Sequence, residues 1–443
     1  MRKMRDSGID WIGTIPQDWE IVRTKSLYCS AKEIAGDRAD DFERLALTLN
    51  GVIKRSKEDS VGLQPEKFSG YQILKKGELV FKLIDLENVA TSRVGLSPYT
   101  GIVSPAYIVL SKQSRAKDLV VRYSMYHFLS MWQREIFNQM GDNGVRSSLN
   151  AKELLNIPHP FPSIYEQKRI VTFLDAQCAE IDAVLEKTHA SIEEYKKLKQ
   201  AIITQAVTKG IRGDRSMKDS GIEWIGNIPA EWSVVRQKYF WNTIESGVSV
   251  NAADKPVDNS EQYGVLKTSA VSKFMFIPTE HKQVNLEEYG RVSCPVRADS
   301  IIASRMNTPE LVGACGYVQN NYPNLFLPDR LWQITFKDEL SPKYAWYYLS
   351  GIRVRQYISS LSTGTSSSMQ NISQSQYGNI FITIPSIGEQ SEIAKYLDEK
   401  CNSVDALIAK KQQYLTEIEN YKKSLIYEYV TGKKEVKISV LAD

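Results

Sequence analysis

Four short segments place Lys, Arg, Asn or Gln beside Gly, Ser and Thr, a mixture suited to contacts with nucleic acid. They are NGVIKRSK at residues 50–57, GVRSS at 144–148, SRMNTPELVG at 304–313 and LSTGTSSSMQN at 361–371. Small polar side chains and backbone N–H groups can contact phosphates, and Arg, Lys, Asn and Gln can read base edges through paired hydrogen bonds. Composition alone is equally compatible with ordinary solvated loops, and a net charge of +4 is too small to identify a nucleic-acid binder.

Signatures of catalysis and of cofactor binding are missing from the sequence. It has no GxxxxGK[S/T] loop, no GxGxxG turn and no Asn/Asp-Pro-Pro-aromatic tetrad of the amino-methyltransferases. Asp398-Glu399-Lys400 could end a nuclease motif, but it lies in a heptad pattern without a paired acidic strand, so we interpret it as solvated helix surface. Four dispersed histidines and five cysteines without a CxxC pair predict neither a metal site nor a disulfide framework. We therefore expect no catalytic residue, no membrane span and a reducing, cytoplasmic setting.

The chain contains a long internal repeat. DSGIDWIGTIPQDWEIVR at residues 6–23 returns as DSGIEWIGNIPAEWSVVR at residues 219–236, with twelve of eighteen positions identical. A second pair follows, PSIYEQ at 162–167 and PSIGEQ at 385–390. The segments between them, about 24–160 and 237–383, show little similarity. The sequence therefore predicts a pseudo-symmetric molecule in which a repeated frame carries two different inserts.

Each PSI segment is followed by a heptad pattern that predicts a long helix. In both copies polar residues occupy the same two seam positions, and Cys178 and Cys401 are expected to be buried as small hydrophobes. About 43 residues at ~1.5 Å rise would make each helix roughly 65 Å long. Because neither helix can bury its stripe alone, we expect an antiparallel pair; two unrelated surface helices on separate domains are the alternative. The predicted seam residues are Leu174, Ile181, Leu185, Ile192, Tyr195 and Ile202 in the first helix, and Leu397, Val404, Ile408, Leu415, Ile418 and Leu425 in the second.

The ends of both helices carry typical signals. Glu166 and Glu389 fall in the first turn, where the helix dipole favours a carboxylate. VTKG at 207–210 and VTGKK at 430–434 combine Gly with Lys and predict the ends. The inserts read as α/β, with strands expected at 71–81, 102–110 (Pro105 marking an edge or bulge), 300–303 and 331–336, and helices at 120–139 and 344–358.

The DSGIEWIGxIPxxW element, the PSIxEQ helix openings and the terminal YKKSLIYEYVTGK resemble the specificity subunits of type I restriction-modification enzymes, over essentially the whole chain. The resemblance implies that each insert is a target recognition domain that reads one half of a split, asymmetric DNA sequence. It implies double-stranded DNA, two modification (methyltransferase) subunits and restriction (translocase/nuclease) subunits as partners. S-adenosylmethionine, ATP and Mg are then expected on the partner subunits and no cofactor on this chain. The first helix departs from the pattern, because its ending LKQAIITQAVTKG is less typical.

The resemblance also places the basic loops where recognition domains contact DNA. Residues 51–56 and 304–308 match the first such loop of each domain, and 144–148 and 363–370 match the second. The candidate DNA-contacting residues are Asn50, Lys54, Arg55, Lys57, Arg93, Arg146, Ser147, Ser148, Lys267, Ser304, Arg305, Asn307, Thr308, Thr365, Ser366, Ser367 and Gln370.

The expected fold class is α+β: two α/β target recognition domains separated by two long helices that form an antiparallel coiled coil, with pseudo-twofold symmetry. The expected parts are 1–160 (repeat segment and first domain), 161–210 (helix), 211–384 (linker, repeat segment and second domain), 385–432 (helix) and 433–443 (tail). Two other functions remain open, a coiled-coil scaffold without DNA specificity and a fused restriction-methyltransferase fragment. The missing catalytic motifs count against the second.

Overall fold

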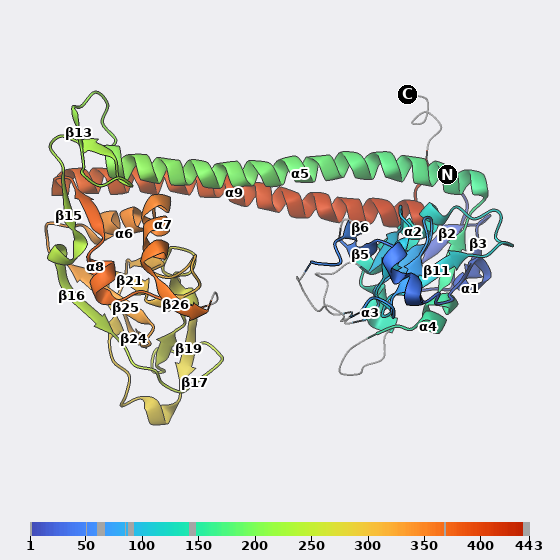
Figure 1. The fold of residues 1–443 in the computed structure, drawn as a ribbon, viewed down its shortest axis with the longest axis horizontal. Coiled ribbons are helices and arrows are strands. Elements are labelled where there is room, and N and C mark those ends of the chain that lie inside the picture. The colour runs from blue at the N-terminus through green and yellow to red at the C-terminus, as the bar shows by residue number, and fades with distance from the viewer. Residues whose placement is uncertain are drawn as a thin grey trace. The chain divides into compact units, whose positions relative to one another are not determined.

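The computed structural model describes residues 2–49, 51–59, 67–84, 86, 93–140, 148–366 and 369–436. The chain divides into two compact units: unit 1 comprises residues 1–188 and 413–443, and unit 2 comprises residues 189–412. Both boundaries fall inside the long helices α5 (Ile164–Lys209) and α9 (Ile387–Val430), so each unit contains one insert and a part of both helices (Figure 1). The long helices are therefore not separate domains.

Unit 1 is built from short strands and helices that precede α5. Its strands form two four-stranded sheets, β6-β5-β10-β7 and β4-β11-β8-β9, and two strand pairs, β1-β2 and β12-β3. A core of Leu, Phe and Tyr side chains packs α2 against β8 and β11. The elements are β1 (Met4–Asp6), β2 (Thr14–Pro16), β3 (Glu20–Arg23), α1 (Thr24–Leu27), β4 (Tyr28–Cys29), η1 (Gly36–Asp41), β5 (Arg44–Thr48), β6 (Gly51–Arg55), β7 (Gln72–Leu74), β8 (Leu79–Phe81), β9 (Val94–Leu96), β10 (Gly101–Val103), β11 (Ile108–Lys112), α2 (Val121–Gln133), α3 (Ile136–Met140), α4 (Ala151–Asn156) and β12 (Pro158–Phe161).

Unit 2 contains the second repeat segment and the second insert. Its sheets are β16-β25-β21-β23, β17-β19-β18-β24-β20 and β22-β27-β26, with the pairs β13-β14 and β15-β28. The elements are β13 (Met217–Asp219), β14 (Asn227–Pro229), β15 (Ser233–Arg236), η2 (Gln237–Phe240), β16 (Trp241–Ser246), β17 (Ala252–Ala253), β18 (Gly264–Leu266), η3 (Thr268–Val271), β19 (His281–Val284), η4 (Leu286–Glu288), β20 (Pro295–Val296), β21 (Ser300–Ser304), β22 (Met306–Asn307), β23 (Cys315–Val318), β24 (Tyr322–Phe326), β25 (Leu331–Phe336), α6 (Pro342–Ser350), α7 (Ile352–Leu361), β26 (Thr363–Ser366), β27 (Met369–Asn371), α8 (Gln374–Gly378) and β28 (Phe381–Ile384).

The repeat is visible in the internal architecture of the two units. The hairpins β1-β2 and β13-β14 have the same antiparallel register, and β3 pairs with β12 as β15 pairs with β28. The order β4-β11-β8-β9 is matched by β16-β25-β21-β23. The sheets β6-β5-β10-β7 and β17-β19-β18-β24-β20 differ in size and strand order, so the difference between the inserts is concentrated there.

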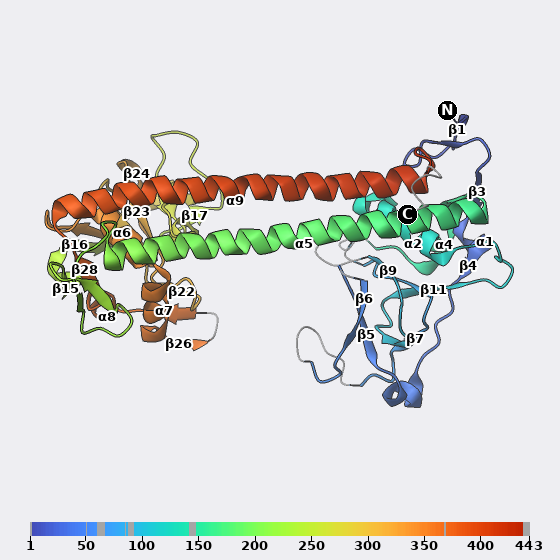
Figure 2. The same cartoon turned by 90° about the horizontal axis from the view of Figure 1, so that it is seen from above.

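Within each unit α5 and α9 run antiparallel and bury their heptad positions together (Figures 1 and 2). In unit 1 the early α5 residues Leu174 and Cys178 share a core with Leu425 near the end of α9. In unit 2 the late α5 residues Ile203, Ala206 and Val207 share a core with Ile393, Leu397 and Cys401 near the start of α9. Every predicted seam residue is buried or half-buried, and full burial of one such Leu stabilises by about 1.5–3 kcal/mol.

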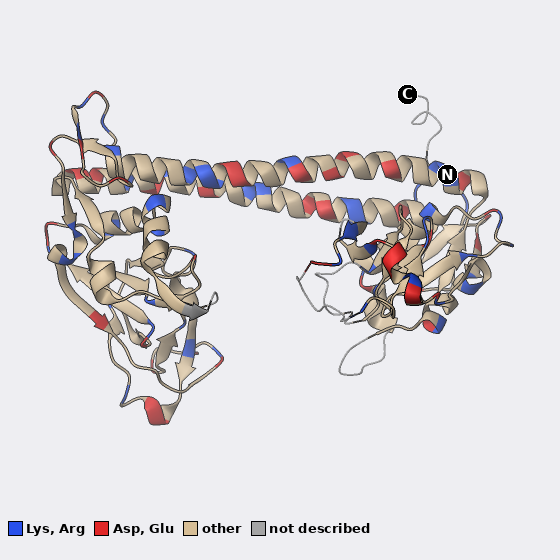
Figure 3. Cartoon of the chain, in the orientation of Figure 1, with Lys and Arg blue, Asp and Glu red and all other residues tan. Residues whose placement is uncertain are grey.

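The polar seam positions make contacts from one helix to the other. Lys199 pairs with Asp405 at 2.6 Å, and Lys422 pairs with Asp182 at 2.5 Å. The ammonium of Lys411 lies 5.7 Å from the centre of the Tyr195 ring. These pairs are partly exposed and contribute little stability, but each one specifies which residues face each other. Outside the seam, Lys, Arg, Asp and Glu alternate along both helices (Figure 3).

The structure corrects the expected insert elements at three places. The single strand expected at 102–110 is two strands, β10 and β11, in different sheets, because Pro105 lies in a turn closed by a hydrogen bond from Tyr107 N–H to Ser104 O. The helix expected at 120–139 ends at Gln133 and resumes at Ile136, with Glu135 at a φ of 58°. The helix expected at 344–358 is interrupted at Gly351, between α6 and α7. The helix breaks lie at similar places in the two inserts.

Candidate nucleic-acid interface and the frame that holds it

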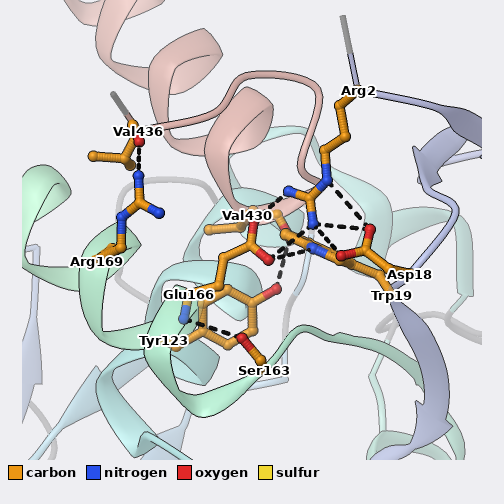
Figure 4. Close-up of polar contacts among 9 residues, drawn as sticks. All are labelled: Arg2, Asp18, Trp19, Tyr123, Ser163, Glu166, Arg169, Val430 and Val436. Atoms are coloured by element: carbon orange, nitrogen blue, oxygen red, sulfur yellow. Dashed lines mark hydrogen bonds and ion pairs between the residues drawn. The ribbon is translucent and has the colours of Figure 1, made fainter. Parts of the chain in front are cut away.

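Three segments of unit 1 meet at the first turn of α5 (Figure 4). Trp19 donates its indole N–H to Oε2 of Glu166 at 2.8 Å, and the guanidinium of Arg2 donates to the same carboxylate. Arg2 also pairs with Asp18 at 2.7 Å. Because the Trp19 side chain is buried, its N–H needs a partner inside the protein. Glu166 therefore joins the repeat segment to the start of α5.

The same arrangement occurs in unit 2. Trp232 donates to Oε2 of Glu389 at 2.9 Å, and Arg215 donates to Oε1 at 2.5 Å while also pairing with Glu231. Burial of the Glu389 carboxylate opposes its ionisation, but the hydrogen bonds from Arg215 and Trp232 outweigh burial and hold its pKa below the usual range. An ionised Glu389 is thus part of the frame. We call each set of Arg, Trp and Glu a frame clamp.

A tyrosine beside each frame clamp binds the end of the other long helix. In unit 1 the hydroxyl of Tyr123 on α2 donates to the carbonyl of Val430, at the end of α9, at 2.9 Å (Figure 4). In unit 2 the hydroxyl of Tyr344 on α6 lies 3.3 Å from the carbonyl of Val207, near the end of α5, and 2.7 Å from Thr383 Oγ1, whose hydroxyl donates to that carbonyl at 2.6 Å. Each unit therefore fastens the start of one long helix and the end of the other to its own insert.

In unit 2 the two loops singled out from the sequence form one small sheet. β22 pairs with β27 through Met306 opposite Asn371 and Asn307 opposite Gln370, and β26 pairs with β27. The Ile372 N–H donates to the Arg305 carbonyl at 3.0 Å. Thus residues about sixty positions apart present one continuous surface, the β22-β27-β26 sheet.

The candidate residues of unit 2 differ in accessibility. Arg305, Asn307, Thr308 and Gln370 are partly exposed, and the Oδ1 of Asn307 accepts the Thr308 N–H at 2.9 Å. In the described part of the chain the Arg305 guanidinium has no ion-pair partner. Lys267 is also partly exposed and lies 4.0 Å from Asp254. Thr365 and Ser366 belong to β26, and Ser367 lies outside the described residues.

Ser304 is a correction. Its side chain is completely buried at the end of β21, where its hydroxyl donates to the Met306 carbonyl. It therefore supports the turn into β22 rather than facing DNA.

The candidate cations of unit 1 are paired with carboxylates. Lys54 on β6 pairs with Glu43 at 2.6 Å, and this hydrogen bond raises the pKa of the Lys54 ammonium. Arg55 pairs with Asp59 at 2.6 Å. Lys57 lies 3.4 Å from Asp40 and donates to the Ala39 carbonyl at 2.9 Å. These cations border an open hollow of about 600 Å³ that also contains acidic side chains.

Arg93 is a second correction, because its side chain is completely buried and so is not part of the accessible surface. Ser148 is exposed and forms an isolated bridge with Ile84. Asn50, Arg146 and Ser147 lie outside the described residues. Among the residues that the structure does describe, the two loops of unit 1 are not paired as they are in unit 2.

Sequence reasoning missed the frame clamps, although their signal was present. Trp19 and Trp232 are identical positions of the repeat, and Glu166 and Glu389 are identical positions of the helix openings. A buried Trp and a first-turn Glu that recur together could have been paired. Within the described ranges no group of His, Cys, Asp and Glu could hold a metal ion. No helix found there has the length and apolar character needed to span a bilayer.

Comparisons with known proteins agree with this architecture. The family model of the type I restriction modification DNA specificity domain matches residues 229–420. The MjaVIII type I restriction enzyme specificity subunit of Methanocaldococcus jannaschii is 26% identical, over 96% of this chain and 94% of that protein. The putative MjaX type I specificity subunit of the same organism is also 26% identical, over 96% of each chain.

A solved chain of a type I restriction-modification system has a similar fold, with a TM-score of 0.68 at 15% identity over 95% of this chain and 99% of that chain. The repeated frame, the two unlike inserts and these matches agree: residues 229–420 match a type I DNA specificity domain, and nearly the whole chain is similar to the specificity subunits of type I restriction-modification enzymes.

Proposed function

We propose that this chain recognises a bipartite, asymmetric DNA sequence within a type I restriction-modification complex, with each insert reading one half. The observation that carries the proposal is the β22-β27-β26 sheet, which unites two separate polar loops on one accessible surface. Arg305, Asn307 and Gln370 supply the side chains that form paired hydrogen bonds with guanine or adenine edges in the major groove. The frame beneath them is common to both units.

The two units offer DNA different surfaces, which predicts unlike half-sites. Unit 2 presents Arg305 without an ion-pair partner among the described residues. In unit 1, Lys54 and Lys57 are held by Glu43 and Asp40, so DNA has to replace these carboxylates. A target read by two such different surfaces is not palindromic.

The α5–α9 pair is, in this proposal, an antiparallel coiled coil that sets the spacer between the half-sites. Its 46-residue and 44-residue helices are fastened at both ends by the frame clamps and the two tyrosines. The cross-helix pairs Lys199–Asp405 and Lys422–Asp182 specify which residues of the two helices face each other. The spacer length is then a property of the helices and not of the reading surfaces.

An exposed apolar stripe on α9, and a shorter one on α5 that Ser191 interrupts, support docking of two modification subunits. Leu407, Tyr414 and Tyr421 recur every seventh residue on α9 and are 42%, 48% and 54% exposed. The repeat-equivalent positions of α5 include Val184 and Leu198, which are 38% and 48% exposed. Apolar side chains in a regular exposed row are typical of a protein contact. S-adenosylmethionine, ATP and Mg would reside on partner subunits, and the chain itself would supply no catalytic group.

An exchange of inserts tests the proposal. Residues 24–160 are replaced by the corresponding segment of another specificity subunit, and methylated adenines are mapped in cells that contain the partner subunits. We expect one half-site to change while the other half-site and the spacer stay the same. Methylation with altered bases in both halves would contradict the division of labour, and a scaffold without DNA specificity would leave the methylation pattern unchanged.

A further inference from the structure

Unit 2 contains a basic hollow that the reading surfaces do not include. It has a volume of about 670 Å³ and lies where the last turns of α5 meet the start of α7. Four cations line it, Lys196, Lys197, Lys209 and Arg353, together with a single carboxylate, Glu193. We call this feature the α5–α7 groove.

The cations of the groove are available to a ligand. Lys196 and Lys197 form only exposed pairs with Glu193 and Glu194, three residues earlier on the same helix, and such pairs contribute little. Lys209 and Arg353 are exposed, and neither has an ion-pair partner within the residues that the structure describes. The α7 helix begins in the groove without a side-chain cap at Gly351, so its first N–H groups add positive partial charge.

The equivalent hollow in unit 1 has a different charge. The end of α9 and the end of α2 form a hollow of about 380 Å³, lined by Lys422 and Lys423 but also by Glu135 and Glu419. Glu419 of α9 occupies the repeat position that is equivalent to Lys196 of α5. Lys422 is already paired with Asp182. The excess of positive charge is therefore specific to unit 2 and is not a by-product of the shared frame.

The groove is connected to the reading surface by a single short helix. α7 starts at the groove and is followed, after Ser362, by β26 of the β22-β27-β26 sheet. Its ten residues span about 15 Å at ~1.5 Å per residue. That length corresponds to slightly less than half of a duplex turn of about 34 Å. A duplex whose base edges meet the sheet and which follows α7 would thus bring phosphates to the groove.

The geometry points to a phosphate-binding role: the α5–α7 groove holds the backbone of duplex DNA beside the half-site that unit 2 reads. This inference rests on the proposed function and adds a contact that carries no sequence information. Lys and Arg that neutralise phosphates release counterions, so such contacts make binding depend on salt. The groove would position the duplex along α7, while the sheet selects the bases.

The test is the salt dependence of DNA binding by the full chain carrying both Lys209→Gln and Arg353→Gln. Binding is titrated on a duplex with the mapped target and on a scrambled duplex, between 50 mM and 200 mM salt. Loss of two phosphate contacts should lower the slope of log K against log salt by about 1.8 on both duplexes. Across this range the wild-type affinity should fall about twelvefold more than that of the variant. The matched control carries Lys400→Gln and Lys410→Gln, two exposed lysines of α9 outside the groove, and should keep the wild-type slope.

Three results would overturn the inference. An unchanged slope would show that the groove does not meet phosphates. A change confined to the target duplex would make Lys209 and Arg353 readers of bases. Weaker binding of the modification subunits with an unaltered DNA slope would make the groove a protein contact. The same titration measures whether the wild-type protein prefers the target duplex. If the proposed function is wrong, the wild-type protein will bind both duplexes with equal affinity, and this result is distinct from failure of the groove inference.

Discussion

The frame clamps predict that one substitution will loosen unit 2 more than its equivalent loosens unit 1. Glu389→Gln retains the shape of the side chain but removes the charge that Arg215 and Trp232 contact. A hydrogen bond to a charged group contributes about 1.5–3 kcal/mol. The side chains of Glu389 and Arg215 are only 4% and 13% exposed, so water replaces little of the lost interaction. We expect Glu389→Gln to cost about 2 kcal/mol of local stability.

The equivalent change in unit 1 should cost less. The side chains of Glu166 and Arg2 are 18% and 21% exposed, more than those of Glu389 and Arg215, while in both units the Arg keeps a second carboxylate partner, Asp18 or Glu231. Solvent screens exposed ion pairs, so Glu166→Gln is expected to cost about 1 kcal/mol. The control is Glu392→Gln. The side chains of Glu392 and of its partner Arg212 are both more than half exposed, so this substitution should have almost no effect on stability.

Hydrogen exchange at pH 7 measures each unit separately, which a single unfolding midpoint cannot do for a chain of two units. In Glu389→Gln, amides of residues 217–236 should exchange about thirtyfold faster, since every 1.4 kcal/mol is tenfold. The ionised form of Glu389 stabilises the fold above the unfolded pKa near 4.5, and its contribution is lost as pH falls through the lower folded pKa. The difference between wild type and variant should therefore shrink at acid pH. Equal or larger effects of Glu166→Gln would refute this explanation of the frame.

Four further predictions follow from the structure. Inserting four residues at facing positions of both α5 and α9 should lengthen the preferred spacer between the half-sites by about two base pairs, because one helical turn adds ~6 Å. Selection of binding sites from random DNA should then return the same half-sites with a longer spacer, and an unchanged spacer would contradict this prediction. Arg305→Ala should reduce discrimination at one or two base pairs by about 1–3 kcal/mol, whereas a uniform loss on all sequences would make it a phosphate contact. Changing Tyr414 and Tyr421 to Ala should reduce the number of bound modification subunits from two to one in native mass spectrometry, and two bound subunits would argue against the α9 stripe. Burial lowers the pKa of the His127 and His159 imidazoles, that of His159 to about 4. Because the unfolded chain gains protons first, the neutral His159 ring should lower the unfolding free energy of unit 1 by about 1.6 kcal/mol between pH 6.5 and pH 5; hydrogen exchange of unit 1 amides across this range, with His159→Gln as comparison, checks this.

The long helices were predictable because their signals are local and repeated. The heptads of both copies fall in one register, and the predicted ends coincide with Gly210 at a φ of 77° and Gly432 at a φ of 70°. At these positions the backbone is left-handed, which glycine adopts without steric cost. Burial of the seam then follows from periodicity alone.

The reading surface was only partly predictable, because composition does not specify where a side chain points. Ser304 and Arg93 belong to polar or basic stretches, yet both are buried. The pairing of Asn307 with Gln370 joins residues far apart in the sequence, and neither loop carries a signal for the other. Loop chemistry could therefore be assigned from sequence, but the accessible subset of residues required the fold.

Each unit holds the start of one long helix and the end of the other. This arrangement explains how the inserts can diverge in sequence while their attachment to the helices is kept. The contacts that hold each unit to the long helices include Tyr123 or Tyr344 at a helix end, and Trp19 or Trp232 at a helix start. Glu166 at the start of α5 accepts the hydrogen bond from Trp19, and Glu389 at the start of α9 accepts the hydrogen bond from Trp232. The Trp–Glu contacts involve repeated residues, and the tyrosines lie on the insert helices α2 and α6. Because none of these contacts uses the sheets that differ, a new reading surface can be accommodated without altering the helix pair. The same separation means that spacer length and base preference should respond to different mutations.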